Sequence, residues 1–341
     1  MMQKALKSIL VVTGDPSLAD PTKPGQRFNP EDLEVARQLG EALATLDGYD
    51  VAFLDRHDEL VERMIAERPD LVLNFCDTGF RNLASRELHV PALLELLDIP
   101  YTGAPPAAMA ICFDKQIVRL IALSMGVPVP RESFVAAGDE APDLVGLLPA
   151  LIKPNQGDGS LGITMHSVVG TVEEAAAYLA WLRRELPGRD ILVQEYLPGA
   201  EYGVGLIGNS GRDLEALPIL EVDYGCLPDG LPPILGYESK SHPDSPYWTE
   251  IRYVRARLDP ARRDLMTEAS VRLFRRLGLQ DYGRFDFRCG ADGVPRLMEV
   301  NPNPAWGYDA KLAMMAGLAG MTYPALLERI IRAALARTGG S

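Results

Sequence analysis

The sequence predicts a mixed α/β and α+β protein made of two or three domains. A chain of 341 residues is longer than one hydrophobic core usually organises. Apolar strand patterns alternate with helical patterns over the first hundred residues, which is typical of a parallel sheet covered by helices. Further along the chain, strands follow one another through glycine-rich turns, which is typical of antiparallel hairpins.

The first segment, residues 1–104, is expected to form an α/β domain. The strand "ALKSILVVTG" leads to the helix "NPEDLEVARQLGEALATL", in which Asn29 is the expected N-cap and Pro30 occupies the first helical position. The strand "VAFLD", a helix over residues 58–67 and the strand "DLVLNF" continue the alternation. These strands should therefore pair in parallel.

The second segment, residues 105–194, is expected to be a small α+β domain. One long helix is predicted from Pro105 to Met125, ending at "GVPVP". The strand "ALIKP", a glycine-rich turn, the strand "GITMHSV" and the helix "TVEEAAAYLAWLRREL" follow. Thr171 and Glu174 form a capping-box pattern at the start of that helix.

The third segment, residues 195–336, is expected to form the last domain, with a frayed tail over residues 337–341. Strands are predicted near residues 201–208, 214–222, 283–289 and 295–300, and helices near residues 260–277 and 322–336.

Composition narrows the class of protein. The chain is 47% hydrophobic and 24% charged, and its net charge of −13 opposes nonspecific binding to nucleic acid. The apolar runs are strand-sized and no signal-peptide pattern begins the chain, so we expect a cytoplasmic protein without a membrane partner. The cysteines show no metal-ligand spacing, so neither a structural zinc site nor a disulfide framework is expected. They are Cys76, Cys112, Cys226 and Cys289.

The turn "NQGDGSLG" matches the spacing of a dinucleotide fingerprint, but a strand pattern follows it where that fingerprint requires a helix. It is better interpreted as a hairpin tip whose backbone N–H groups and Ser160 approach phosphate oxygens; a flexible hairpin without a ligand is the alternative. Lys153 ends an apolar strand just before the turn, and a phosphate would offset the cost of burying its ammonium. Lys115 and Lys240 are further candidates, although each taken alone is more simply a solvated lysine.

The segment "YGRFDFRCGADGVPRLMEVNPNP" predicts a metal site. Two strands joined at "GADG" carry Asp286, Glu299 and Asn301, whose oxygen atoms suit Mg²⁺. The alternative is a surface network in which Arg284 and Arg288 pair with the two carboxylates. The prolines after the second strand favour a fixed functional elbow.

These motifs together resemble the ATP-grasp superfamily, and within it the D-alanine:D-alanine ligases. The resemblance runs from "LLELLDIPYTGAPPAAMAICFDK" through "LIKPNQGDGSLGI", "ILVQEYLPGAEYGVGLIGN" and "GRFDFRCGADGVPRLMEVNPNP", and covers roughly residues 90–335. It implies a three-domain ATP-grasp architecture with an N-terminal Rossmann-like α/β domain, a ligase that uses ATP, and a homodimer.

The resemblance also implies roles for single residues. Lys115, Lys153 and Lys240 would bind ATP phosphates, with Gly159 and Ser160 in the hairpin that covers them. The backbone of Glu195, Tyr196 and Leu197 would meet adenine, and Glu201 the ribose. Asp286, Glu299 and Asn301 would hold two Mg²⁺ ions, for which Mn²⁺ could substitute. Arg284 would stabilise the tetrahedral oxyanion, and Lys240 would reach the terminal phosphate.

The chain departs from the family on the amino-acid side. The family's glutamate in an N-terminal glycine-rich turn has no counterpart before Glu31, and its partner serine and tyrosine fall at Gly159 and Ser241. The family's glycine after the elbow and the serine that binds the second substrate are Ala305 and Ala310 here, followed by Lys311.

The expected substrate residues, among them Ser241, follow from these departures. Trp306 and Tyr308 are hypothesised to line a larger acceptor pocket and Lys311 to pair with an acceptor carboxylate; core packing or a solvated helix face is the alternative for each. Arg86 and Glu87 could orient the first amino acid, or merely cap the helix that follows them.

The leading prediction is an ATP-dependent carboxylate–amine ligase that forms an amide or dipeptide bond through an acyl phosphate, with amino acids or peptides other than two D-alanines as substrates. A D-alanine:D-alanine ligase with a divergent pocket is one alternative. A catalytically inactive ATP-binding scaffold or sensor is another. A nicotinamide oxidoreductase is rejected, because the glycine pattern lies in the wrong strand context.

Overall fold

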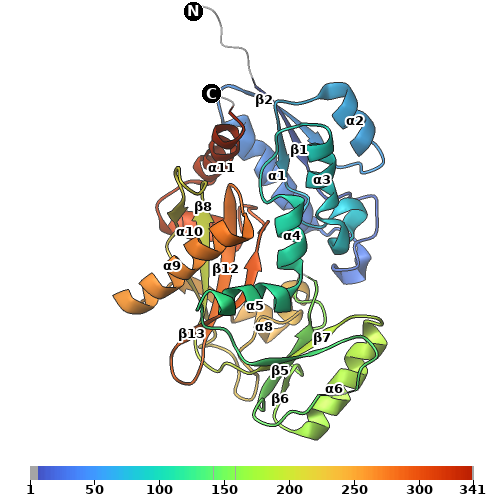
Figure 1. Ribbon diagram of the computed structural model, residues 1–341. Coiled ribbons are helices and arrows are strands. Elements are labelled where there is room, and N and C mark those ends of the chain that lie inside the picture. The colour runs from blue at the N-terminus through green and yellow to red at the C-terminus, as the bar shows by residue number, and fades with distance from the viewer. Residues whose placement is uncertain (1–6, 141, 158, 340–341) are drawn as a thin grey trace, which may run out of the picture.

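The computed structural model describes residues 7–140, 142–157 and 159–339, which form three sheets with helices around them (Figure 1). None of the helices in these ranges combines the length and the apolar composition needed to cross a membrane. Residues 1–6, at the start of the expected first domain, and residues 340–341 of the expected tail lie outside the described ranges.

The first sheet has the strand order β2-β1-β3, and both pairings are parallel, as predicted. The strands are β1 (Lys7–Val12), β2 (Tyr49–Leu54) and β3 (Leu71–Asn74), and the helices are α1 (Pro30–Ala44), α2 (Leu60–Glu67) and α3 (His89–Leu96). Short 3₁₀ turns lie at Pro24–Gln26, Phe80–Asn82 and Ala84–Arg86. Asn29 caps α1 as expected, and Asp32 completes a capping box with it.

The second sheet has the order β4-β7-β5-β6 and is antiparallel. Its elements are β4 (Glu132–Val135), β5 (Ala150–Pro154), β6 (Val168–Val169), α6 (Val172–Glu185) and β7 (Ile191–Glu195). The capping box of Thr171 and Glu174 is confirmed. The strand predicted at "GITMHSV" is wrong for most of its length. The Tyr178 hydroxyl lies 2.7 Å from Ser167 Oγ and 3.1 Å from Gly162 O, which ties this segment into turns.

The third sheet has the order β11-β10-β8-β12-β13, with β9 beside β8. Its strands are β8 (Glu201–Ile207), β9 (Glu215–Ala216), β10 (Leu220–Asp223), β11 (Arg252–Arg255), β12 (Tyr282–Cys289) and β13 (Pro295–Asn301). The helices are α7 (Glu238–Ser241), α8 (Pro246–Thr249), α9 (Pro260–Leu277), α10 (Lys311–Leu318) and α11 (Tyr323–Arg337). The structure adds α7, α8, α10 and β11 to the predicted elements.

The single helix predicted from Pro105 to Met125 is wrong, because the chain breaks at Asp114. α4 (Pro106–Phe113) ends there and α5 (Lys115–Ser124) begins, with the Asp114 carboxylate accepting a hydrogen bond from Ile117 N at 2.9 Å. Both helices share a core with α9, β8 and β12. We therefore propose that the central domain begins after Val127 rather than at residue 105.

The last helix joins the first and third sheets. Ile9 and Val11 of β1 share one core with Ile330 and Ile331 of α11, while the alternate residues of β1 face α2 and α3. Arg337 ends α11 and donates hydrogen bonds to the buried Asp281 carboxylate, at 2.9 Å from Nη2, and to the carbonyl of Tyr101. Arg337 therefore belongs to the folded body and not to the expected tail.

Candidate active site

A pocket of about 450 Å³ lies where the three sheets approach one another. It is lined by loops of the first sheet, by the glycine-rich turn after β5, and by the ends of β12 and β13. The predicted site residues that line it are Glu87, Lys115, Lys153, Gly159, Ser160, Glu195, Tyr196, Leu197, Glu201, Lys240, Arg284, Asp286, Glu299, Asn301 and Lys311. The structure thus brings most of the predicted site into one place.

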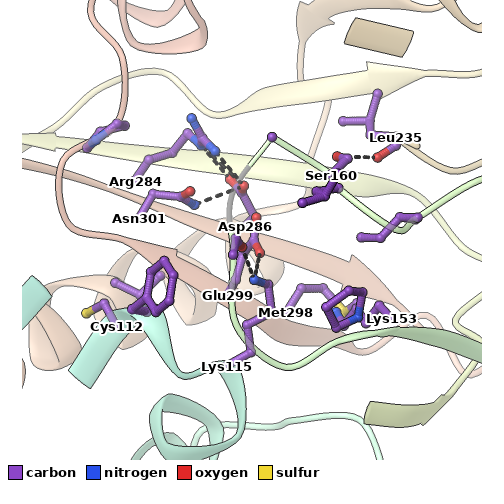
Figure 2. A pocket seen from close by; sticks show the side chains of 18 of the residues that line it. Cys112, Lys115, Lys153, Ser160, Leu235, Arg284, Asp286, Met298, Glu299 and Asn301 are labelled. Atoms are coloured by element: carbon purple, nitrogen blue, oxygen red, sulfur yellow. Dashed lines mark hydrogen bonds and ion pairs between the residues drawn. The ribbon is translucent and has the colours of Figure 1, made fainter. Parts of the chain in front are cut away.

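Two carboxylates form the centre of the pocket. Asp286 lies directly opposite Glu299 in the antiparallel register of β12 and β13. Arg284 donates two hydrogen bonds to Asp286, at 2.9 Å from Nε and 3.0 Å from Nη2, and Asn301 Nδ2 donates a third at 3.2 Å. Figure 2 shows both side chains directed at Asp286, with Lys115 directed at Glu299.

The surface network considered as an alternative is not what the structure contains. Asp286 does pair with Arg284, but it is buried, with only 7% of its surface exposed. Arg288 points elsewhere, with its guanidinium 3.0 Å from Glu201. Both acids therefore line the pocket, where Asp286 is buried and the Glu299 side chain is 33% exposed.

Cationic neighbours keep both acids ionised. Burial alone would raise the pKa of Asp286, but the charges of Arg284 and Lys311 outweigh it and hold that pKa below its usual value. The pKa of Glu299 is likewise held low, because Lys115 and Lys153 more than offset its burial and the repulsion from Asp286. Both groups are thus negatively charged at neutral pH.

The pocket's donor set suits a magnesium ion. Two ionised carboxylates and an amide oxygen are hard ligands, and Mg²⁺ typically takes one or two carboxylates and fills its shell with substrate phosphates. Among the described residues no cluster of three or more His, Cys, Asp and Glu side chains meets at one point. Asp286, Glu299 and Asn301 fit the ion when a phosphate-bearing ligand shares it.

Three of the lysines that line the pocket come from α5, β5 and α7. Lys115, the first residue of α5, donates to the carbonyl of Gly157 and lies 3.9 Å from Glu299. Lys153 on β5 is only 3% exposed, and burial, with the nearby Arg119 guanidinium, lowers its pKa to about 7. Lys240 on α7 is exposed at the rim. Positive charge is thus supplied from three sides.

Another wall of the pocket is formed by Glu195, Tyr196, Leu197 and Glu201. Glu201 accepts hydrogen bonds from the Tyr224 hydroxyl at 2.7 Å and from Arg288 at 3.0 Å, so its carboxylate is held in place. Glu195 lines the same wall, and its carboxylate accepts a hydrogen bond from Arg131 at 2.8 Å. Ser160 donates to Leu235 O at 2.9 Å and thereby ties the glycine-rich turn to the opposite wall.

The predicted substrate residues divide into two groups. Glu87 and Lys311 line the pocket. Glu87 accepts a hydrogen bond from Asn303 at 2.9 Å, and the Lys311 ammonium lies 5.5 Å from the centre of the Tyr253 ring. Arg86 does not line the pocket; it ends the short 3₁₀ turn that precedes Glu87.

Three other hypothesised substrate residues lie away from the pocket. Trp306 is 1% exposed and packs edge-on against Phe75, and its indole N–H donates to the Tyr282 hydroxyl at 3.1 Å. Core packing is therefore the correct interpretation of Trp306. Ser241 is buried and donates to Tyr237 O at 2.6 Å, while Tyr308 is 42% exposed outside the pocket.

Several residues on the N-terminal side of the pocket were not predicted from the sequence. Thr22, Lys23, Asp77 and Thr78 line it from loops after β1 and β3. Their only sequence signal is position, because polar residues after parallel strands gather at the carboxyl edge of the sheet. Arg288 also lines the pocket, although the sequence pattern indicated it only as a partner of the central acids.

The chain is similar in sequence and in fold to known ligases. The family model of the D-ala D-ala ligase C-terminus matches residues 139–332. The D-alanine–D-alanine ligase of Desulfotalea psychrophila is 30% identical, over 88% of this chain and 93% of its own. The ATP complex of the Bacillus anthracis enzyme superposes with a TM-score of 0.73 at 22% identity, covering 98% of this chain and 99% of that one. The structure of VanG, a D-Ala:D-Ser ligase of Enterococcus faecalis, superposes with a TM-score of 0.70 at 18% identity. The superposition covers 96% of this chain and 99% of that one.

Proposed function

Because this chain belongs to the D-alanine–D-alanine ligase family, we propose that it joins a carboxylate to an amine through an acyl-phosphate intermediate. Family membership makes it an ATP-dependent, ADP-forming carbon–nitrogen ligase with an ATP-grasp fold. The finer proposal is that the substrates are amino acids or peptides and that the pair is not two D-alanines. The observation that carries it is the contrast between the fully equipped phosphate side of the pocket and its altered amino-acid side.

On the phosphate side of the pocket, the position of each residue is compatible with a role in binding ATP. Lys115, Lys153 and Lys240 surround the pocket with positive charge and would bind the ATP phosphates. The backbone of Glu195, Tyr196 and Leu197 would meet adenine and Glu201 the ribose. The turn with Gly159 and Ser160 would cover the phosphates and exclude water.

The reaction proceeds in two displacements. An oxygen of the substrate carboxylate attacks the γ-phosphorus and ADP leaves, which gives an acyl phosphate. The amine nitrogen then attacks the acyl carbon, and the amide forms as inorganic phosphate leaves. Arg284 would donate to the oxyanion that develops on the acyl carbon, a contribution typically worth about 3 kcal/mol. Magnesium held by Asp286, Glu299 and Asn301 would supply charge neutralisation.

On the amino-acid side, the residues differ from the family pattern. Ala305 and Ala310 provide no hydroxyl for an acceptor carboxylate, whereas Lys311 lines the pocket and provides a cation. No glutamate precedes Glu31, and the groups that line the opposite wall are Lys23, Asp77 and their neighbours. These exchanges support a different pair of substrates.

The proposal is tested by measuring phosphate release from Mg-ATP with the full chain across D- and L-amino acids and short peptides, with the product mass determined. We expect a mixed amide or dipeptide. A D-alanine-dependent release that yields only D-alanyl-D-alanine would instead establish the alternative, a D-alanine:D-alanine ligase with a divergent pocket. Tight ATP binding without phosphate release for any pair would support a scaffold or sensor.

A further inference from the structure

A second cavity of about 240 Å³ adjoins the active-site pocket between α1 and residues 305–310. Both spaces are lined by Lys23, Asp77, Thr78 and Ala305. We call this second cavity the annex. Because the two spaces share a wall, a ligand seated in the active site can extend into the annex without crossing the core.

The walls of the annex are apolar and its charges are acidic. The apolar part consists of Pro16, Phe28, Leu33, Val35, Ala36, Phe75, Ala305 and Ala310, and the carboxylates are Asp32, Asp55, Asp77 and Asp309. Among the described residues, Lys23 is the one cation that lines it, and Lys23 is paired with Asp32 at 2.5 Å. The charge that remains for a ligand is therefore negative.

Two of these carboxylates are uncommitted. No hydrogen bond or ion pair joins Asp55 or Asp309 to another residue in the described part of the chain. Asp55 follows β2, and Asp309 precedes α10, so two separate segments of the chain bring them to the annex. Asp32 differs, because it accepts hydrogen bonds from both Asn29 N and Lys23.

The annex is also firmly built. Asp15 beside it accepts hydrogen bonds from His57 N and Ser17 N, both at 2.9 Å, and Asn82 binds the backbone of Asp15 through both N–H and C=O. A Cβ on Gly14 would come within 2.7 Å of Thr78 Oγ1, so the loop approaches its neighbour as closely as glycine permits. The cavity is thus held open by its framework.

We propose that the annex receives the side chain of the amine substrate and selects a basic amino acid, one with an aliphatic stem that ends in an ammonium or guanidinium group. This inference rests on the proposed ligase function and adds the substrate class. The stem would bury apolar surface against Phe28, Val35 and Phe75, and the cation would reach Asp55 and Asp309.

We assign the amine substrate to the annex because of where the residues after β13 lie. Ala305 borders both spaces and Ala310 borders the annex, while Lys311, the next residue, lines the main pocket and is the proposed partner of the acceptor carboxylate. An acceptor bound to Lys311 therefore lies next to the entrance of the annex.

The test compares lysine, ornithine and arginine with norleucine and alanine as amine substrates, in both enantiomeric forms. Norleucine has the stem of lysine without its ammonium, so the comparison isolates the charge. We expect kcat/KM for a basic amine to exceed that for norleucine at least tenfold. Asp55→Asn combined with Asp309→Asn should reduce this preference about tenfold, whereas Asp47→Asn with Asp50→Asn, a pair outside the annex that changes the net charge equally, should not.

A second variant tests the shape of the annex. Ala36→Leu should lower the preference for lysine over alanine, because the new side chain fills the annex; Ala44→Leu on the exposed end of the same helix is the matched control. Circular dichroism and gel filtration verify that each variant folds.

Calorimetric titration of lysine and norleucine into the full chain with Mg-ADP separates this inference from the proposed function. If no amine supports phosphate release, the ligase proposal fails. The calorimetry then still tests whether the annex selects a basic side chain. Tighter binding of lysine, lost in the Asp55/Asp309 variant only, supports the inference. Equal binding of lysine and norleucine, or an equal loss in the control pair, overturns it.

Discussion

Asp286 stands directly opposite Glu299 across the β12–β13 pair, and each carboxylate has its own cationic partner. Arg284 binds Asp286, and Lys115 lies 3.9 Å from Glu299. Two acids that face each other in a buried strand pair would repel strongly without these cations. The arrangement holds two negative charges at one point of the pocket wall, where a metal-bound triphosphate would need them.

Glu299→Gln should lower kcat for phosphate release at least about a hundredfold while the fold is retained. The substitution keeps the side chain's shape and removes the charge that would bind Mg²⁺. The concentration of Mg²⁺ needed for half-maximal activity should rise as well. Glu268→Gln, an exposed position on α9, is the control. Unchanged activity and metal dependence in Glu299→Gln would remove Glu299 from the metal site.

Lys153→Met should stabilise the protein and weaken nucleotide binding. Lys153 is 3% exposed, and its pKa of about 7 lies well below the ordinary value of about 10.4. Between these two values the unfolded chain binds the proton that the folded chain lacks, so the wild-type protein becomes more stable as pH rises. The advantage of Lys153→Met should thus be greatest below pH 7 and shrink by about 1.4 kcal/mol per pH unit above it.

Thermal melting at pH 6.5, 8 and 9 measures that advantage. The exposed Lys240→Met provides the comparison, and its melting temperature should follow the wild-type value at every pH. An advantage of Lys153→Met that grows with pH would contradict the prediction.

Nucleotide affinity should weaken as pH rises above 7. The phosphates of a bound nucleotide favour the charged form of Lys153, so they raise its pKa in the complex and a proton is taken up on binding. Affinity for ADP should be highest below pH 7, which is about the pKa of Lys153 in the free protein. It should fall as pH rises from there to the higher pKa of Lys153 in the complex. Titration calorimetry in buffers of different ionisation enthalpy detects the proton uptake, which should be absent in Lys153→Met.

Lys311→Ala should raise KM for the amine substrate about tenfold and leave KM for ATP nearly unchanged. The ammonium lies in the pocket, beside the region where the chain departs from its family, and would pair with a carboxylate. Lys311→Arg should restore part of the loss. An unchanged amine KM in an active Lys311→Ala enzyme would disprove the carboxylate role.

Asp281→Asn should cost about 2 kcal/mol of stability. The Asp281 carboxylate is fully buried and accepts hydrogen bonds from Gly103 N, Asn209 and Arg337. Removing its charge leaves Arg337 without its ion-pair partner, although the 21% exposure of Arg337 moderates the cost. A fall in melting temperature measures the effect. Arg332→Ala, which breaks an exposed pair with Glu328, should change it little.

Local signals predicted much of the fold, and longer-range packing accounts for the errors. The caps at Asn29 and Thr171 act within three residues of their partners, so both could be predicted from the sequence. The break at Asp114 could not, because apolar periodicity continues through it and the reason for the turn is packing against the third sheet. The strand expected at "GITMHSV" failed because the hydroxyl of Tyr178, on the helix that follows, hydrogen-bonds Ser167 and Gly162 and ties the segment into turns.

The candidate site shows the same division. Asp286, Glu299 and Asn301 belong to one hairpin, and a two-residue period was enough to place them together. Trp306 was misjudged because a tryptophan beside an elbow has the same sequence appearance in a core as in a pocket. Lys23 and Asp77 come from loops far from that hairpin, so only the folded chain brings them to the pocket.

The sharing of one core by β1 and α11 sets an order for biosynthesis. One face of the first sheet, with Ile9 and Val11, shares its core with α1 and with Ile330 and Ile331 near the end of the chain. The first hundred residues can cover this face in part with α1, but a ribosome must make almost the entire polypeptide before its core is complete. Until then the nascent chain presents an apolar surface, so we expect it to require a holding chaperone during translation.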